Sequence, residues 1–130
     1  MATGVHAVNL ADKWLNVLRN TSATAIAAVF VKLHTADPGA AGATAAAAGS
    51  TTRPAITWAA ASGGAIAMNG TAPSWTNGGT SETLSHLSFW DSSTAGNFLG
   101  SCALGSTQAW NTGNVFTLTA QGWSITPIAA

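Results

Sequence analysis

The chain has 130 residues, of which 6% are charged, and its formal net charge at pH 7 is zero. An ordinary soluble domain has about 25% charged residues, so this composition excludes the basic face that a nucleic-acid-binding protein needs and weakens the case for an enzyme. The length fits one domain, and the single cysteine rules out an internal disulfide.

The N-terminal sequence predicts no targeting or membrane segment. Met1–Gly4 lacks the basic region and apolar run of a signal peptide. The most apolar stretch, Ala23–Leu33, contains Lys32 and is too short to span a bilayer. We therefore expect a protein that is not inserted in a membrane, and its nearly uncharged surface favours association with copies of itself.

An amphipathic helix is predicted from about Leu10 to Arg19, with Asn9 as its N-cap. Its apolar face consists of Leu10, Trp14, Val17 and Leu18. We expect this face to pack on the rest of the domain or on a neighbouring subunit, which makes these residues candidates for an assembly interface.

The remainder of the chain predicts short strands separated by turns that are rich in Gly and Asn. The predicted strands are 25–33, 55–61, 65–69, 84–90, 97–104, 115–120 and 123–128, with a surface loop over 40–52 and a loop over 72–79. In 84–90, alternation places Leu87 on one face and Leu84 on the other. This pattern indicates a mainly β fold: a single antiparallel, jelly-roll-like β-sandwich preceded by one N-terminal amphipathic α-helix. One domain over 1–130 is expected, with the helical part at about 9–20 and the sandwich at about 24–130.

Several residues are predicted to define the fold rather than a site. Asp37, Pro38 and Gly39 form a turn signal, because Pro presets its φ and Gly accepts a positive φ. Asp91 begins a second polar turn, and Arg53 is expected in a buried or interfacial pair.

The residues that could carry catalysis or bind metal are few. His34 and Asp37 could orient a general base, but the simpler interpretation has Asp37 capping its turn and His34 closing a strand. His6 and His86 could join His34 at a metal ion, yet none shares helical spacing with another ligand. Cys102 fits a small core residue. We expect no catalytic residue, no cofactor and no metal.

The six tryptophans leave two interpretations open. Three of them stand at alternating strand positions, where core or subunit interface is the simpler role; these are Trp58, Trp90 and Trp123. Trp75 and Trp110 lie beside turns and are the better candidates for exposed stacking, with Asn77 or Asn111 near enough to bind hydroxyl groups. The same two rings are also candidates for the assembly interface. A carbohydrate-binding module that uses these exposed rings is therefore the alternative function.

Four segments of the sequence form a recognisable set: Val29–Gly39, Arg53–Gly64, Leu87–Gly100 and Gly113–Trp123. In this order, and over nearly the whole chain, they resemble a family of small bacteriophage virion proteins of the tail-fibre or minor tail type. The resemblance implies a structural part of a tailed-phage particle, without catalysis. A surface position as a tail protein or as a capsid decoration is compatible with it.

The resemblance also sets expectations about partners and location. We expect the chain to assemble as a homo-oligomer, for example a trimer, and to contact other virion proteins. A glycan of the host surface is a further partner under the carbohydrate alternative, and nucleic acid is not expected. The protein is expected in the virion, after synthesis in the cytoplasm of the bacterial host.

Overall fold

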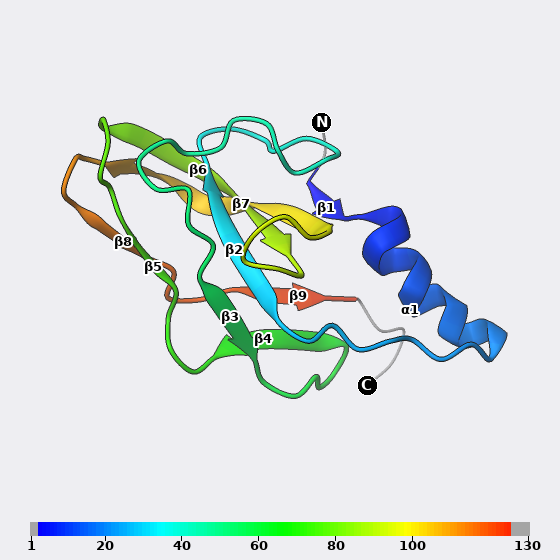
Figure 1. Cartoon of the computed structure of the whole chain (residues 1–130). Helices are drawn as coiled ribbons and strands as arrows, with labels where there is room; N and C mark the ends of the chain where they lie inside the picture. The colour runs from blue at the N-terminus through cyan, green and yellow to red at the C-terminus, as the bar shows by residue number, and fades with distance from the viewer. Residues whose placement is uncertain (1–2, 126–130) are drawn as a thin grey trace.

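The computed structural model describes residues 3–125 (Figure 1). A helical segment projects from the sheet near the N-terminus. It has three successive parts: a π-helical turn, Ala7–Ala11 (η1), an α-helix, Asp12–Asn16 (α1), and a 3₁₀ turn, Val17–Arg19 (η2). We call residues 4–19, which include the short strand β1 (Gly4–Val5), the arm, and residues 29–125 the body. No helix in the described residues is long and apolar enough to cross a membrane.

The predicted helix is confirmed, but it begins at Ala7, because His6 and not Asn9 caps it. His6 Nδ1 accepts a hydrogen bond of 3.2 Å from the backbone N–H of Asn9. The Asn9 side chain instead donates to the carbonyl oxygen of Phe98 at 2.8 Å, which ties the arm to the body. The helix ends at Arg19, and its C-cap Asn20 adopts a left-handed conformation (φ 60°) that asparagine tolerates.

The body consists of strands and their connections. Its strands are β2 (Val29–His34), β3 (Ala55–Trp58), β4 (Ala65–Asn69), β5 (Ser74–Thr76), β6 (Glu82–Trp90), β7 (Phe98–Trp110), β8 (Val115–Thr117) and β9 (Gly122–Ser124). The main sheet has seven antiparallel strands in the order β1-β7-β6-β2-β3-β4-β9, and β5 pairs with β8 in a small second sheet. A curled, sandwich-like antiparallel sheet behind one short helix confirms the predicted fold class (Figure 1).

The core lies on the central strands of the main sheet. β2 pairs with β6 so that Val31 stands opposite Phe89 and Leu33 opposite Leu87. These four side chains are fully buried. Large and β-branched apolar residues in paired positions pack well across a sheet, so these two strands anchor the fold.

An irregularity in β6 explains why its buried residues do not alternate strictly. Between Leu84 and His86 the pairing with β7 shifts its register. Such a bulge turns the strand, and Leu84 and Leu87, three positions apart, both reach the core. The prediction that Leu84 faces away from Leu87 is therefore wrong.

The main sheet curls, so that β9 at its edge lies over the face formed by β6 and β7. Trp123 of β9 packs edge-on against Phe89 of β6, with ring centroids 5.1 Å apart. It also lies over Gly100 of β7, where a Cβ atom would stand 2.9 Å from the indole ring. The curl therefore depends on a glycine at position 100.

The small sheet lies at the end of the molecule away from the arm (Figure 1). The sequence predicts a loop over 72–79, but Ser74–Thr76 forms β5 and pairs with β8. Trp75 faces Phe116 across this pair, with ring centroids 5.9 Å apart. Strands of three residues are too short to give a periodic signal, which is why the prediction is wrong here.

Other predicted elements are present with shifted ends. The strand predicted over 97–104 continues to Trp110 as part of β7. The predicted surface loop over 40–52 is partly buried, since Ala47 belongs to the core and its N–H donates to the carbonyl oxygen of Leu33 at 3.0 Å. The last predicted strand, 123–128, forms β9 only over Gly122–Ser124, and residues 126–128 lie outside the described residues.

Candidate functional site

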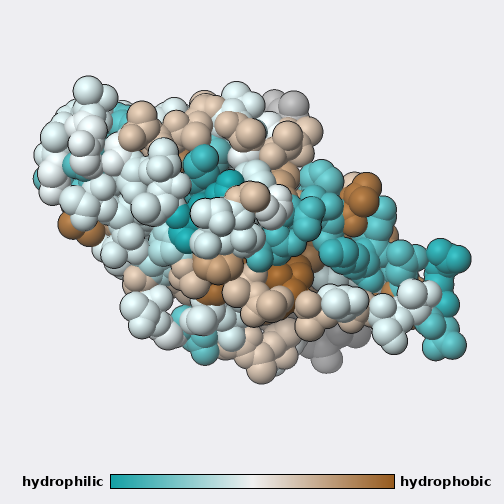
Figure 2. All heavy atoms as spheres, viewed as in Figure 1, coloured by the Kyte–Doolittle hydropathy of each residue, from teal (hydrophilic) through white to brown (hydrophobic). Residues whose placement is uncertain are grey.

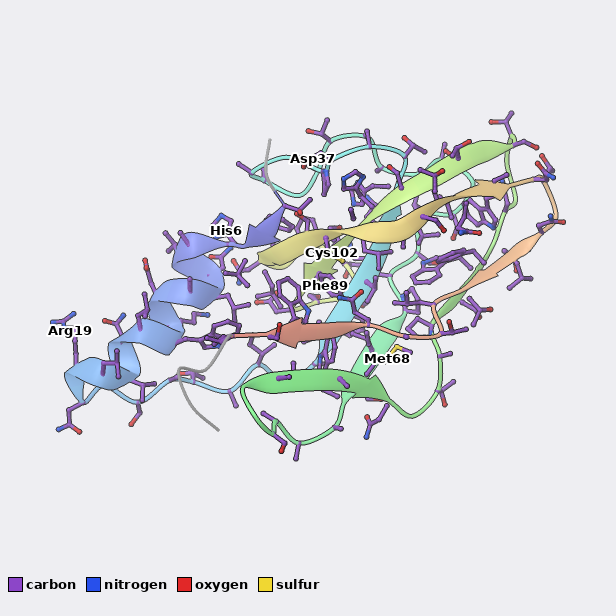
Figure 3. All side chains as sticks on the ribbon, turned by 180° about the vertical axis from the view of Figure 1, so that it is seen from behind. His6, Arg19, Asp37, Met68, Phe89 and Cys102 are labelled. Atoms are coloured by element: carbon purple, nitrogen blue, oxygen red, sulfur yellow. The ribbon has the colours of Figure 1, made fainter. Side chains whose placement is uncertain are left out.

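The predicted apolar face of the helix becomes more exposed along the arm. Leu10 is 8% exposed and belongs to the core, so it packs on the body. Trp14 and Val17 are about half exposed, and Leu18 is 86% exposed. Figure 3 shows Arg19 at the far tip of the arm, away from the sheet. The second half of this face therefore offers apolar surface to solvent.

Three further apolar side chains of the arm are exposed and were not predicted as site residues: Val5, Val8 and Leu15. Val8 precedes the predicted helix, and Leu15 falls outside its predicted stripe. Val8 lies in η1, Leu15 in α1 and Leu18 in η2, so exposed apolar side chains occur in all three helical parts of the arm. The side of the arm that faces the viewer in Figure 2 is mostly hydrophilic, with hydrophobic side chains at its upper margin.

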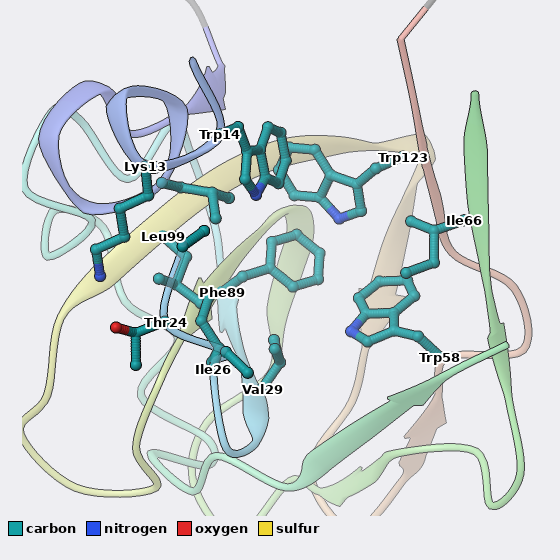
Figure 4. Close-up of a pocket in the computed structure, with 13 residues that line it drawn as sticks. Lys13, Trp14, Thr24, Ile26, Val29, Trp58, Ile66, Phe89, Leu99 and Trp123 are labelled. Atoms are coloured by element: carbon teal, nitrogen blue, oxygen red, sulfur yellow. The ribbon is translucent and has the colours of Figure 1, made fainter. Parts of the chain in front are cut away.

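An apolar groove runs between the arm and the curled sheet (Figure 4). One part is a cavity of about 280 Å³, and a second part of about 330 Å³ shares three of its walls, Trp14, Ile66 and Trp123. Figure 4 shows the side chains of Trp58, Phe89 and the shared residues turned toward this space. We call the two parts together the arm groove; its larger lining residues are Val5, Leu10, Lys13, Trp14, Ile26, Val29, Trp58, Ile66, Phe89, Leu99, Trp123 and Ile125.

The arm groove offers little hydrogen bonding to a ligand. Apart from the indole N–H groups, its polar lining side chains are Lys13, Thr24 and Ser124. A sugar needs several donors and acceptors around its hydroxyl groups, whereas apolar side chains gain free energy from burial alone. The chemistry of the groove therefore fits apolar protein side chains better than a glycan.

The tryptophans predicted to be exposed are buried, and that prediction is wrong. Trp75 and Trp110 are each 2% exposed. The Trp75 N–H donates to the carbonyl oxygen of Thr52 at 3.1 Å, and the Trp110 N–H donates to that of Asn114 at 3.0 Å. Residues beside turns face solvent on average, but here the small sheet and the connecting loops fold over both rings. Neither ring can stack on a sugar or contribute to an assembly surface.

Asn77, one of the two residues expected to bind hydroxyl groups, holds the loops around Trp110 instead. It is fully buried, and its side-chain N–H₂ group donates to the carbonyl oxygens of Thr80 at 3.0 Å and Trp110 at 2.7 Å. Its Oδ1 accepts from the backbone N–H of Gly79 at 2.9 Å. The other candidate, Asn111, lies exposed in the turn after β7. Asn77 thus serves the fold and has no free group for a ligand.

The turn predicted from Asp37, Pro38 and Gly39 is confirmed. Asp37 Oδ1 accepts a hydrogen bond of 2.8 Å from the backbone N–H of Gly39, and Gly39 adopts the positive φ of 73° that a glycine permits. Pro38 is buried. These residues fix the start of the long connection between β2 and β3.

Arg53 binds carbonyl oxygens and an aromatic ring. Its Nη1 donates to the carbonyl oxygens of Ala95 at 2.7 Å and Ser92 at 3.4 Å. The guanidinium lies over the ring of Trp90, 3.8 Å from the ring centroid, where a cation–π interaction is favourable. Partial burial lowers the pKa of Arg53. The structure thus gives Arg53 a role in holding the 92–95 turn, and its role in an interface stays a prediction.

Asp91 closes the same turn, as predicted. Its Oδ1 accepts from the backbone N–H of Asn97 at 2.6 Å, and its Oδ2 from the side-chain N–H₂ of Asn97 at 2.8 Å. Partial desolvation works to raise the pKa of Asp91, but these hydrogen bonds and the charge of Lys13 outweigh it and hold the pKa below its usual value. A Cβ atom at Gly96 would lie 2.6 Å from Asp91 Oδ1, so the turn requires glycine there.

His34 does not pair with Asp37 as a catalytic couple would. It is fully buried, with Nδ1 2.8 Å from the carbonyl oxygen of Thr44 and Nε2 2.7 Å from Ser88 Oγ. Trp90 donates its N–H to the same Ser88 oxygen at 2.8 Å. A neutral ring that donates from Nδ1 and accepts from the Ser88 hydroxyl satisfies every member of this chain. Since His34 and Ser88 are both 0% exposed, the pair cannot meet a substrate in this structure.

We expect the stability of the protein to fall on mild acidification because of His34. Burial lowers its pKa; positive charge on Lys32 and His86 acts in the same direction, and the hydrogen bond to Thr44 partly opposes it. The unfolded chain therefore binds a proton more readily than the folded one. Stability is complete above the unfolded pKa of about 6.5 and falls below it, by at most about 1.4 kcal/mol per pH unit, until the folded pKa is passed.

The matched variant is His34→Gln, which removes the titrating group. Urea denaturation at pH 7.5, 6.5 and 5.5 measures the free energy of unfolding of both chains. The wild-type value should fall more steeply between pH 6.5 and 5.5 than that of the variant. Parallel pH profiles would show that His34 is as easily protonated in the folded state as in the unfolded one.

The three histidines do not meet at one point. His6 is on the arm, and His34 and His86 stand opposite each other on β2 and β6. Within residues 3–125, no three side chains of His, Cys, Asp or Glu are grouped as a metal site would require. Cys102 is partly buried, its Sγ lies 3.6 Å from Gln121 Oε1, and burial raises the pKa of its thiol to about 11. Such a thiol is a poor nucleophile at neutral pH.

Comparison with known proteins identifies the family. The family model described as podophage GP4 fiber I protein gp80 matches residues 7–126, which include the arm helix and nearly the whole body. No curated protein matches the sequence. The match includes every residue of the body and covers far more than half of the chain, and it agrees with the resemblance to phage virion proteins noted in the sequence. The chain therefore belongs to this family of phage fibre proteins, whose members are structural components of the virion.

Proposed function

We propose that this chain is a non-catalytic subunit of a phage fibre that associates with copies of itself through the apolar surface of its arm. One observation carries the proposal. Of the eight large hydrophobic side chains that are exposed in the described residues, six belong to the arm, and a seventh, Ile125, lines the arm groove. Exposed apolar residues concentrated in one region mark a contact surface, whereas scattered ones need no explanation.

The energetics support association through this surface. Burying a Leu or Val side chain that is otherwise exposed contributes about 1.5–3 kcal/mol. Leu15, Val17 and Leu18 together therefore contribute several kcal/mol per copy. With 6% charged residues in the chain, few ions need to lose their hydration when copies meet. Membership in a family of structural phage proteins supports a role without catalysis. The burial of the hydrogen-bonded His34 and Ser88 side chains supports it as well.

The double substitution Leu15→Ser with Leu18→Ser is expected to dissociate the assembly and leave the fold intact, because both side chains point to solvent in the single chain. Sedimentation velocity over a hundredfold range of concentration measures the association. The wild-type chain should form a discrete oligomer, and the double variant should sediment as a monomer with an unchanged circular dichroism spectrum.

The chain offers its own control for this experiment. Val115 is 61% exposed but lies on β8, at the other end of the molecule. Val115→Ser should leave the oligomer unchanged. A wild-type chain that is monomeric at every concentration would contradict the proposal, and so would equal dissociation by the Val115 substitution.

A further inference from the structure

The arm contacts the body through a small and self-contained set of interactions. β1 pairs with β7 through Gly4 opposite Ser101 and Val5 opposite Gly100. The next contacts lie on the same stretch of β7: the His6 N–H donates to the carbonyl oxygen of Leu99 at 2.7 Å, and Asn9 donates to that of Phe98. Leu10 and Trp14 add apolar contact at the arm groove. All these contacts come from residues 4–14, which we call the first half of the arm, and residues 15–19 are its second half.

The second half of the arm and the segment after it are bound only weakly to the body. Leu15, Val17, Leu18 and Arg19 are exposed, and Asn20–Ala25 forms neither helix nor strand and is exposed throughout. The chain returns to the body at Ile26, which packs against the core. We call residues 20–25 the linker. Six extended residues span about 20 Å, so the linker can direct the arm to its own body or to a neighbouring one.

We infer that the arm is exchanged between copies of this chain: the arm of one copy docks on β7 of the next and forms the arm-side wall of that copy's groove. This inference rests on the self-association proposed above and names the segment that makes it. The docking site is defined by the structure itself, because the arm already lies there against β7 with a paired strand and two hydrogen bonds, and Leu10 and Trp14 form one wall of the arm groove. Exchange of an identical element keeps all these contacts.

Exchange also accounts for the exposed apolar residues of the second half of the arm. When the first half docks on a neighbour and Ile26 stays on its own body, residues 15–25 must cross from one copy to the other. Leu15, Val17 and Leu18 then lie between two bodies, where they can be buried. In the single chain they face water, so the crossing adds apolar burial that the unexchanged fold lacks.

A pair of cysteines across the β1–β7 pairing tests the exchange. Gly4→Cys and Ser101→Cys are introduced together in a Cys102→Ser chain, and each is also made alone as a control. The two positions are register partners and line the same pocket. A Cβ atom at Gly4 meets nothing within 4 Å, and the φ of Gly4, 159°, is close to fully extended. Paired residues in antiparallel strands have Cα atoms about 4.5–5.5 Å apart, within the range of a disulfide.

The purified protein is oxidised at a concentration at which sedimentation gives its oligomeric state, and is then run on a denaturing gel without reductant. We expect the double variant to be linked into covalent dimers or larger species in most of the material, and the single-cysteine controls to show few links. An oligomer whose disulfides all lie within single chains would overturn the exchange and leave self-association standing. A monomer with internal disulfides would overturn both. If no disulfide forms, a short bis-maleimide is used to crosslink the same two cysteines. If this reagent also gives no crosslink, the result contradicts the β1–β7 pairing and therefore the inference.

Discussion

Replacing Trp110 with alanine is expected to lower the free energy of unfolding by about 3–5 kcal/mol. The indole ring is almost fully buried, and its N–H donates to the carbonyl oxygen of Asn114 at 3.0 Å. Truncation leaves a large cavity, and it also leaves that carbonyl without its partner. Urea denaturation followed by circular dichroism measures the loss.

Trp14→Ala is the matched control, because Trp14 lies on the arm and is about half exposed. Its loss should cost about 1 kcal/mol or less. Equal losses for the two variants would contradict the burial of Trp110. Because Trp110 is buried, a loss of ligand binding in Trp110→Ala would be explained by unfolding and would not show that the ring contacts a ligand.

Replacing Gly100 with alanine is expected to destabilise the protein by about 1–3 kcal/mol and to loosen the arm. The new Cβ atom would lie 2.6 Å from the carbonyl oxygen of Gly4, 2.9 Å from the ring of Trp123 and 3.1 Å from Cα of Val5. Two of these three atoms belong to the backbone of β1, which cannot move aside as a flexible side chain can. Denaturation gives the loss of stability, and limited proteolysis near Asn20 reports whether the arm leaves the body.

Gly105→Ala is the control for this substitution. Gly105 lies on the same strand, and a Cβ atom there would meet nothing within 4 Å. This variant should keep its stability and its resistance to proteolysis. If Gly100→Ala behaves like Gly105→Ala, the close approach of β1, β7 and β9 is not as the structure describes it.

Local signals in the sequence were sufficient for most of the fold. The strand that reaches Leu33, the short turn between the strands predicted over 55–61 and 65–69, and the Asp37 turn depend on neighbouring residues alone, and the structure contains all three. The helix was also predicted, although His6 gave no recognisable signal as its cap. Such features are decided by backbone preferences over a few positions.

Features set by contacts between distant segments were not predictable. The bulge after Leu84 moves a residue to the core without changing the hydrophobic pattern. Trp75 and Trp110 stand beside turns, a position that suggests exposure, but loops from elsewhere in the chain cover both rings.

The arm groove could not be predicted either, because it is also formed by segments that are far apart in the sequence. Its walls come from the arm, the linker and six strands of the body, so no window of sequence contains it. The sequence did identify Leu10, Trp14, Val17 and Leu18 as a candidate surface. It did not separate Leu10, which packs on the body, from Leu18, which faces solvent.

An electron-microscopy map of fibres that contain this chain, at a resolution that traces the backbone, tests the central claim most directly. We predict several copies in contact, with residues 4–19 of each copy at the contact with the next and no large hydrophobic side chain of the arm left in solvent. Copies that stand alone, or that touch through the β5–β8 end with their arms free, would contradict the claim.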